Sequence, residues 1–225
     1  MRLLTSLRIA FEGWIYLVCG TYKVAGIDGL VYGTVLGPDT RCWLDRNLGA
    51  SRVANSYDDS QAYGYLFQWG RANDGHQIRT SSTIIGPVST DTPGSFFVTL
   101  TTSGDWRNPQ NSNLWQGVSG INNPCPSGFR IPTGGAGGEW KTLVNAGSTI
   151  TNSATAYAST LKLTAGGNRH YSGAVYNSNI FGNYWSSRLF SDAVNAYLLG
   201  FSSSTVSPEA ANYRGAGFSV RCIKD

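Results

Sequence analysis

The sequence predicts a single domain of the α+β class. Two segments with helical spacing of apolar residues, 61–71 and 139–146, precede a run of short strand-like segments that starts after Gly147, and helices followed by antiparallel strands define that class. The length of 225 residues fits one domain with an insertion. Apolar residues make up 41% and charged residues 13% of the chain, which favours a sizeable core and excludes a disordered chain, a collagen or a coiled coil.

The chain begins with a mostly apolar extension, residues 1–21. Arg8 and Glu12 interrupt the apolar stretch, no small-residue cleavage site follows it, and it is too short to span a bilayer. We therefore expect an N-terminal element packed on the domain that follows, residues 22–225. A cleaved or lipidated leader is the alternative.

A β-hairpin is predicted at the start of that domain. The strand-like segments 22–25 and 30–36 flank Asp28-Gly29. This dipeptide suits the positive φ angles of a tight hairpin turn, so the two segments are expected to pair with each other.

The first helix is predicted over residues 61–71. The Asp-Asp-Ser sequence at 58–60 offers good N-caps, and Tyr65, Leu66 and Trp69 recur at helical spacing after it. The helix is predicted despite Gly64.

The second helix is predicted over residues 139–146, with Thr133 as its cap. Trp140, Leu143 and Val144 form an apolar stripe on this helix, which is expected to face the core.

Between the two helices, residues 74–124 are rich in Ser, Thr, Asn, Gly and Pro. Only 96–101 has the pattern of a strand. A stretch of this kind inside a domain is typical of a functional loop or an insertion, and we expect Trp106 and Trp115 to fix it to the core.

The C-terminal part predicts a sheet. Short strand-like segments with turn residues between them follow one another, at 157–163, 168–176, 183–187, 195–201, 204–207 and 217–223.

Composition and motifs argue against several classes of function. The formal charge is +4, but the 17 lysines and arginines are scattered without a basic stripe, so no nucleic-acid partner is expected. The four cysteines are too widely spaced for a zinc module. The chain has no GxSxG, phosphate-loop or HExxH motif, and His76 and His170 are interpreted as hydrogen-bonded histidines rather than general bases. We therefore expect no catalytic residue.

A set of motifs occurs in one order along residues 22–225, and the set is specific although no single motif is. The motifs are Ile27-Asp28-Gly29, Tyr32-Gly33-Thr34-Val35, Trp43 with Asn47-Leu48, Tyr63-Gly64-Tyr65-Leu66 with Trp69, the nine residues from Cys125 to Thr133, Glu139-Trp140, Gly166-Gly167-Asn168-Arg169, Tyr184-Trp185-Ser186-Ser187 and Gly217-Phe218-Ser219-Val220-Arg221-Cys222. The chain thereby resembles the Fibrobacter succinogenes major paralogous domain. The resemblance implies a C-type lectin-like fold, with two helices, small twisted antiparallel sheets and a long irregular region. The glycine-rich piece 134–138 departs from the family pattern and puts the start of the second helix in doubt.

The motif residues also carry individual expectations. Cys125 and Cys222 lie in two of the motifs and are candidates for a disulfide, with buried thiols as the alternative in a reducing compartment. Trp185 is expected in the core, and Arg169 is expected to pair with a buried carboxylate or carbonyl. The calcium-ligand triplets of sugar-binding lectins are absent, so no cofactor is expected, and a structural calcium ion stays open and unassigned.

Residues 171–216 have the composition of a binding surface. They contain nine Ser, five Asn and five Tyr but only four charged residues, Arg188, Asp192, Glu209 and Arg214, which resembles an antibody paratope. Strand alternation predicts that Tyr197, Leu199, Phe201 and Val206 point inward. It predicts that Leu198, Gly200, Ser202, Thr205 and Ser207 point outward, and 190–195 is expected to be an exposed connection.

This arrangement is similar to the variable proteins of diversity-generating retroelements, in which template adenines are randomised within a C-terminal region of the same fold. The resemblance implies a variable region at about 188–216 and a protein that binds a protein or a cell-surface receptor, displayed on a virion or cell. Because the randomised adenines lie chiefly in Asn-type codons, the variable positions should carry residues reachable from codons that end in a pyrimidine. Glu209 is not such a residue and is excluded. The candidate ligand-binding residues are Phe190, Asp192, Val194, Asn195, Leu198, Gly200, Ser202, Thr205, Ser207, Asn212 and Tyr213.

Two other functions remain open at this stage. One is a cell-surface adhesin or structural domain whose surface does not vary. The other is an oxidase of the formylglycine-generating type, which would need a pair of reactive cysteines in a C-terminal cleft, whereas only Cys222 lies in that part of the chain.

Overall fold

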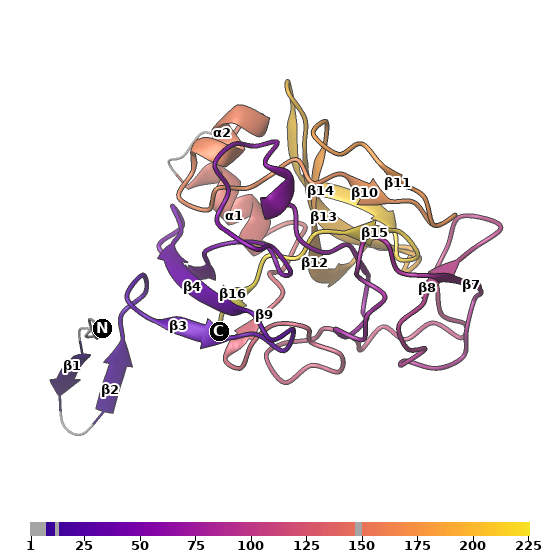
Figure 1. Ribbon diagram of the computed structural model, residues 1–225, viewed down its shortest axis with the longest axis horizontal. Coiled ribbons are helices and arrows are strands. Elements are labelled where there is room, and N and C mark those ends of the chain that lie inside the picture. Colours follow the sequence, from indigo (N-terminus) through magenta and orange to yellow (C-terminus); the bar gives the residue numbers. More distant parts are fainter. Residues whose placement is uncertain (1–7, 12–13, 147–149) are drawn as a thin grey trace.

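Strands dominate the computed structural model, which describes residues 8–11, 14–146 and 150–225 (Figure 1). The α-helices of this described part are α1 (Glu139–Asn145) and α2 (Ser153–Ala158), and a 3-10 turn spans Ser60–Ala62. The architecture is therefore mostly sheet with two helices, either α+β or mainly β.

A five-stranded sheet contains the predicted hairpin. Its order is β3-β4-β5-β16-β9, and its strands are β3 (Lys23–Ala25), β4 (Val31–Leu36), β5 (Cys42–Leu44), β16 (Ile223–Lys224) and β9 (Phe129–Arg130). β3 and β4 pair antiparallel, as the Asp28-Gly29 turn predicts. Gly29 has a φ of 79°, and the Asp28 side chain accepts a hydrogen bond from the Leu30 amide at 3.1 Å.

The N-terminal extension forms a second hairpin, β1 (Arg8–Phe11) with β2 (Trp14–Leu17), which Figure 1 shows to one side of the sheets. A disulfide between Cys19 and Cys42 ties the end of the extension to β5. Packing of the whole of 1–21 on the domain stays a prediction, because residues 1–7 and 12–13 lie outside the described part.

Where the sequence predicts a helix over 61–71, the structure has one short strand, β6, of a four-stranded sheet. Its order is β11-β10-β15-β6, and its strands are β11 (Val175–Tyr176), β10 (Asn168–Arg169), β15 (Gly217–Phe218) and β6 (Phe67–Gln68). The helix prediction is wrong beyond Ala62. Asp59 does cap a helical turn there, but Gly64 then adopts a φ of 69°, and the chain from Leu66 to Trp69 is buried on every side, which one helix face could not achieve.

The helix α1 starts at Glu139, where the sequence predicts it. Thr133 helps to hold this start, because its hydroxyl oxygen accepts a hydrogen bond from the Glu139 amide at 3.1 Å, although Gly138 is the N-cap residue. Trp140 and Leu143 are buried, and Val144 packs against the same apolar cluster.

The predicted strand 157–163 is wrong, because α2 occupies its first part. The Asn152 side chain accepts from the Thr155 amide and the Thr155 side chain bonds back to the Asn152 amide, which makes a capping box that starts this helix. The predicted strand 168–176 is likewise split into β10 and β11 by a turn, in which the His170 amide donates to Ala174 O at 2.8 Å.

The insertion 74–124 is held by its two tryptophans, as predicted. The Trp106 indole donates to Trp69 O at 2.7 Å, and the Trp115 indole donates to Arg71 O at 3.1 Å; both rings are buried. The insertion contains a parallel pair of strands, β7 (Thr83–Ile85) and β8 (Phe97–Thr99), and β8 corresponds to the predicted strand 96–101.

The third sheet is β12 (Gly182–Leu189), β13 (Asn195–Phe201) and β14 (Val206–Tyr213), in that order. Side chains alternate along β13 as predicted, and Leu199 and Phe201 enter one apolar cluster with Tyr184. The opposite face is also covered, because Ala196 and Leu198 enter a second cluster with Trp185. Leu198 is only 2% exposed, so the prediction that it faces solvent is wrong.

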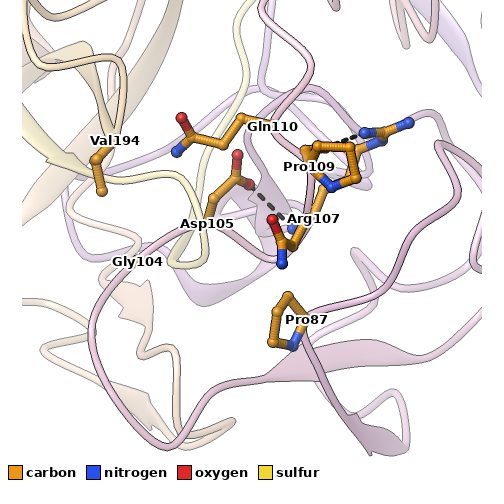
Figure 2. Close-up of a pocket in the computed structure, with 8 residues that line it drawn as sticks. Pro87, Gly104, Asp105, Arg107, Pro109, Gln110 and Val194 are labelled. Carbon is orange, nitrogen blue, oxygen red and sulfur yellow. Dashed lines mark hydrogen bonds between the residues drawn. The ribbon is translucent and has the colours of Figure 1, made fainter.

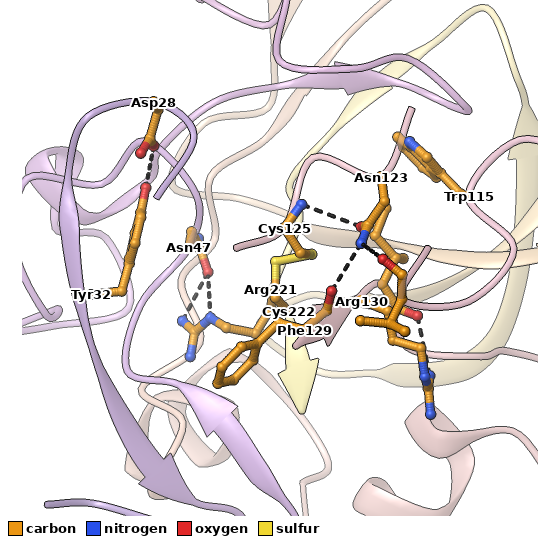
Figure 3. The surroundings of a disulfide bond; sticks show 12 residues. Asp28, Tyr32, Asn47, Trp115, Asn123, Cys125, Phe129, Arg130, Arg221 and Cys222 are labelled. Carbon is orange, nitrogen blue, oxygen red and sulfur yellow. Dashed lines mark hydrogen bonds between the residues drawn. A yellow bond between two sulfur atoms is a disulfide. The ribbon is translucent and has the colours of Figure 1, made fainter. Parts of the chain in front are cut away.

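Buried polar residues join these sheets. Arg221 donates to Asn47 Oδ1 at 2.8 Å (Figure 3). It also donates to Leu161 O at 2.6 Å, and Asn47 Nδ2 in turn donates to the Tyr184 hydroxyl at 3.1 Å. Arg169 donates to the carbonyls of Gly173 at 2.8 Å and Ser81 at 2.7 Å, which is the carbonyl pairing that the sequence predicts.

A second disulfide lies beside this network, between Cys125 and Cys222 (Figure 3). It joins the start of the motif that leads into β9 to the residue just before β16, and β9 and β16 are neighbours in the five-stranded sheet. The four cysteines of the chain are thus all engaged in disulfides.

Candidate functional site

Ten of the eleven candidate ligand-binding residues are at least partly open to solvent, and Leu198 is the exception. Asp192, Thr205, Ser207, Asn212 and Tyr213 are exposed. Phe190, Val194, Asn195, Gly200 and Ser202 are half-buried.

These residues lie at two ends of the β13–β14 hairpin rather than in one patch. Asn195 pairs with Tyr213 at one end of the hairpin, and Phe201 pairs with Val206 at the other. Six residues of strand separate the ends, which is about 20 Å. We call Phe190, Asp192, Val194, Asn195, Asn212 and Tyr213 the loop-end group, and Gly200, Ser202, Thr205 and Ser207 the turn-end group.

The turn-end group is a tight polar turn. The Ser202 amide donates to Thr205 O at 2.9 Å, and the Ser202 and Thr205 hydroxyls are 2.8 Å apart. Ser207 pairs with Gly200 across the strands, where the register shifts. The group presents small polar side chains and no aromatic ring.

The connection 190–195 in the loop-end group is ordered by one carboxylate. Asp192 accepts hydrogen bonds from the amides of Val194 at 3.0 Å and Asn195 at 2.9 Å, and from Asn195 Nδ2 at 2.6 Å. The bonds from Asn195 are the main reason why the pKa of Asp192 is lowered. The exposed connection therefore has a defined shape.

Aromatic side chains adjoin this connection. The Phe190 and Tyr197 rings meet edge to face with centroids 5.1 Å apart, and the Arg188 guanidinium lies 5.9 Å from the Tyr197 centroid. Tyr197 is half-buried, although the sequence predicts that it points into the core. Pairs of this kind contribute beyond their buried area and offer rigid contact surface.

Arg214 holds the loop-end group to the insertion. Its side chain is fully buried; Nη2 donates to Asn111 O at 2.6 Å, and Nη1 donates to Ala193 O at 3.3 Å and lies 3.0 Å from Asp105 Oδ2. The Trp69 ring stacks against the guanidinium, 4.4 Å from its carbon. In the sequence Arg214 is only one charged residue in a polar segment, and nothing there marks it as the centre of this contact.

A cleft lies where the insertion meets the connection 190–195. It has a volume of about 490 Å³ and is lined by Pro87, Gly104, Asp105, Arg107, Asn108, Pro109, Gln110 and Val194 (Figure 2). Of the eleven predicted residues only Val194 lines it. The sequence gives no signal for the other seven, because they approach Val194 only through the tertiary fold.

Asp105 is the buried acid of this cleft. Burial raises its pKa to about 6, although Arg214 and Arg107 pull in the other direction. Its Oδ1 accepts a hydrogen bond from the Arg107 amide at 3.2 Å. Its Oδ2, despite the proximity of Arg214, makes no hydrogen bond.

The two histidines both have hydrogen-bond partners. His76 is fully buried; its Nε2 accepts from the Gln68 amide at 3.1 Å and its Nδ1 lies 2.5 Å from Asp74 Oδ1. His170 is half-buried and contacts the Ser172 hydroxyl at 2.8 Å through Nδ1.

The burial of His76 predicts a pH dependence of stability. Burial lowers the pKa of His76 from 6.5 to about 4, so in this window the unfolded chain binds a proton that the folded chain does not. The stability should therefore fall as the pH drops from 6.5 to 4, by up to ~3 kcal/mol. The raised pKa of Asp105 has the opposite effect on stability. The folded chain holds the Asp105 proton more tightly than the unfolded chain, and the stability gained from this is lost as the pH rises through about 6.

The variant His76→Gln removes the titrating imidazole but can keep its hydrogen bonds, because an amide side chain can both accept from the Gln68 amide and donate to the Asp74 carboxylate. Denaturant unfolding at pH 4, 5, 6 and 7 should show that wild type loses stability relative to this variant as the pH falls. His170→Gln is the matched control and should keep the wild-type profile. Parallel profiles of wild type and His76→Gln would show that the buried imidazole does not titrate in this way.

Within the described part of the chain, no three His, Cys, Asp or Glu side chains are grouped so that they could hold a metal ion. The helices described there are also too short and polar to cross a membrane. Comparison with family models, with curated proteins and with solved structures found no match to this chain.

Proposed function

We propose that this chain is a ligand-binding display protein with a C-type lectin-like fold, whose surface residues in the segment 188–216 are diversified by a retroelement to bind varied protein or receptor targets. The observation that carries this proposal is the solvent exposure, full or partial, of ten of the eleven candidate residues. Their neighbours on β13, Ala196, Leu198, Leu199 and Phe201, are buried in the two apolar clusters.

This division favours a surface that can change while the fold stays the same. Substitutions at exposed sites usually alter stability within about ±0.5 kcal/mol. The buried neighbours supply the packing that fixes β13 between its two partner strands. New target contacts can therefore arise without refolding.

The loop-end group is proposed as the main contact surface. It contains Phe190 and Tyr213, and aromatic side chains dominate the energetics of most protein interfaces. It also borders the cleft, whereas the turn-end group offers only small polar side chains. The two disulfides are consistent with display in an oxidising environment such as a virion or cell surface.

The DNA around the gene tests the retroelement. We expect a near-copy of the C-terminal coding region beside a reverse-transcriptase gene, with differences confined to template adenines. The structure adds that the differing codons should leave the buried Ala196, Leu199 and Arg214 unchanged. A solitary gene without a template copy would instead support an adhesin whose surface does not vary.

Stability measurements test the division between surface and framework. Ser207→Ala, Thr205→Ala and Asn212→Ser are expected to leave the free energy of unfolding within about 0.5 kcal/mol of wild type. Leu198→Ala should lower it by about 3 kcal/mol, because it removes a buried side chain opposite Trp185. Similar losses at the exposed and the buried positions would contradict the proposal.

The oxidase alternative has little support in the structure. Cys222 is fully buried and bonded to Cys125, and the other two cysteines are bonded to each other, so no free thiol is present. A peptide-cysteine oxidase assay is expected to show no turnover, and turnover that Cys222→Ser abolishes would overturn this interpretation.

A further inference from the structure

Four aromatic side chains form a row on the surface beside the loop-end group, and we call them the aromatic row. The Tyr213 and Tyr171 ring centroids lie 6.4 Å apart. The Tyr171 and His170 centroids lie 3.9 Å apart, and those of His170 and Tyr176 lie 6.0 Å apart. Tyr213 is 36% exposed and Tyr176 is 51% exposed, while Tyr171 and His170 are half-buried. Contiguous apolar surface that stays open to water is typical of an interaction site.

The turn between β10 and β11 carries the middle of the aromatic row and has a defined shape. The His170 amide donates to Ala174 O at 2.8 Å, and the Gly173 amide donates to His170 O at 2.8 Å. The Leu100 amide donates to Tyr171 O at 2.9 Å and so ties the turn to the insertion. The rings are therefore held in place before a ligand arrives, which lowers the entropy cost of binding.

The ring planes of the row define two corners. The Tyr213 and Tyr171 planes are perpendicular, at 90°, and those of His170 and Tyr176 meet at 75°. The centres of the two corners are at most about 10 Å apart, and prolines one turn apart in a polyproline II helix are separated by about 9 Å. Grooves lined by aromatic rings are a recurring binding site for this helix. A sugar chain would instead stack on flat, exposed ring faces, whereas both corners here are edge-to-face contacts.

The aromatic row lies in an uncharged part of the chain. No Asp, Glu, Lys or Arg occurs from His170 to Ser187, and the arginines next to the row in the sequence, Arg169 and Arg214, are buried. The polar groups of the row can act as hydrogen-bond donors instead. Its three tyrosines carry hydroxyls, and His170 Nδ1 accepts from the Ser172 amide at 3.2 Å, so the hydrogen of the neutral ring is on Nε2. This combination suits an uncharged ligand that offers apolar rings and carbonyl acceptors.

We propose that the aromatic row binds an uncharged, proline-rich segment of a target protein in the polyproline II conformation. One proline ring packs into each corner. The tyrosine hydroxyls and His170 Nε2 donate to backbone carbonyls of the segment, which have no partner within a polyproline II helix.

That the segment belongs to a displayed protein's target rests on the proposed function; the ring geometry does not. His170, Tyr171 and Tyr176 lie outside the segment 188–216, so they stay the same when that segment is diversified. Tyr213 joins them to the loop-end group. The fixed rings supply a constant part of the affinity, and the loop-end group supplies the part that varies between targets.

The experiment is an NMR titration of the ¹⁵N-labelled full chain with acetylated and amidated decaproline at neutral pH. Saturable shifts are expected at the amides of Tyr171, Ser172 and Tyr176. A peptide of the same length made of alternating Gly and Ser, which has neither rings nor a preformed helix, should cause no saturable shifts. Cellohexaose tests the sugar chain and should also cause none.

The variant Tyr176→Ala should weaken decaproline binding by about tenfold, because it removes one wall of a corner. Tyr176→Phe keeps the ring and should bind more tightly than Tyr176→Ala. The matched control is Tyr57→Ala, which removes an exposed tyrosine outside the row and should leave binding unchanged. Tyr213→Ala, at the other corner, covers the case in which Tyr176→Ala is poorly folded, and should weaken binding likewise.

Three results would overturn the polyproline site. They are the absence of saturable shifts with decaproline, equal binding of decaproline by wild type and both alanine variants, and binding of the Gly-Ser peptide or cellohexaose as tight as that of decaproline. None of these results affects the template-copy test, so failure of the aromatic row and failure of the proposed function can be told apart.

Discussion

Replacing Arg214 with methionine is expected to lower the free energy of unfolding by about 4 kcal/mol, because removing one partner of a buried pair leaves an uncompensated buried charge. The charge left behind is Asp105, whose side chain is nearly inaccessible. The carbonyls of Asn111 and Ala193 also lose their donor. Denaturant unfolding at pH 7 measures the loss.

The matched control for Arg214→Met is Arg188→Met. Arg188 is an exposed arginine on β12 of the same sheet, and its removal should cost about 0.5 kcal/mol or less. The double variant Arg214→Met/Asp105→Asn should recover part of the loss, since the stranded carboxylate is gone. Equal costs for the two single arginine variants would show that Arg214 does not hold the insertion to the connection 190–195.

Loss of the Cys125–Cys222 disulfide should lower the free energy of unfolding at least as much as Arg214→Met does. The bond closes a loop of 97 residues, for which the chain-entropy model gives about 4.7 kcal/mol. The Cys19–Cys42 bond closes a loop of 23 residues and gives about 3.4 kcal/mol in the same model. The double alanine variant at 125 and 222 is therefore expected to be less stable than the one at 19 and 42.

Thermal and denaturant unfolding of the two double variants measures this order, and each serves as the control for the other. Cys222 also lies inside the core cluster that contains Trp185 and Phe129, so its alanine variant leaves a small cavity there. A Cys19/Cys42 variant that is the less stable of the two would contradict the loop-length explanation.

Local patterns predicted well wherever neighbours in the sequence decide the structure. The β3–β4 turn depends on Asp28 and Gly29, and the start of α1 depends on the contact between Thr133 and Glu139. These interactions involve residues at most six positions apart. The motif resemblance added the pair Cys125 and Cys222, which local spacing does not indicate.

Predictions failed where tertiary packing overrode a local pattern. The apolar residues of 61–71 suit a helix, but Leu66, Phe67 and Trp69 satisfy their burial by passing through the core beside β15. The failure at 157–163 has a local cause instead: the capping box of Asn152 and Thr155 starts a helix just upstream of the segment interpreted as a strand, and the strand prediction overlooked it.

The candidate site shows the same limit. Alternation along β13 correctly separates its two faces, but it does not reveal whether water or protein covers the second face, and for Leu198 the answer is the Trp185 cluster. The aromatic contact of Phe190 with Tyr197 and the role of Arg214 likewise depend on how separate segments meet.

By itself the sequence determined the β3–β4 turn and the start of the helix at Glu139, because turn residues and caps act over a few neighbouring positions. Only the tertiary structure decided that the candidate residues fall at two ends of one hairpin, and that the insertion places Asp105 beside Val194. The physical reason is that burial and the meeting of charges depend on contacts between residues far apart in the chain, and those contacts exist only once the sheets have packed.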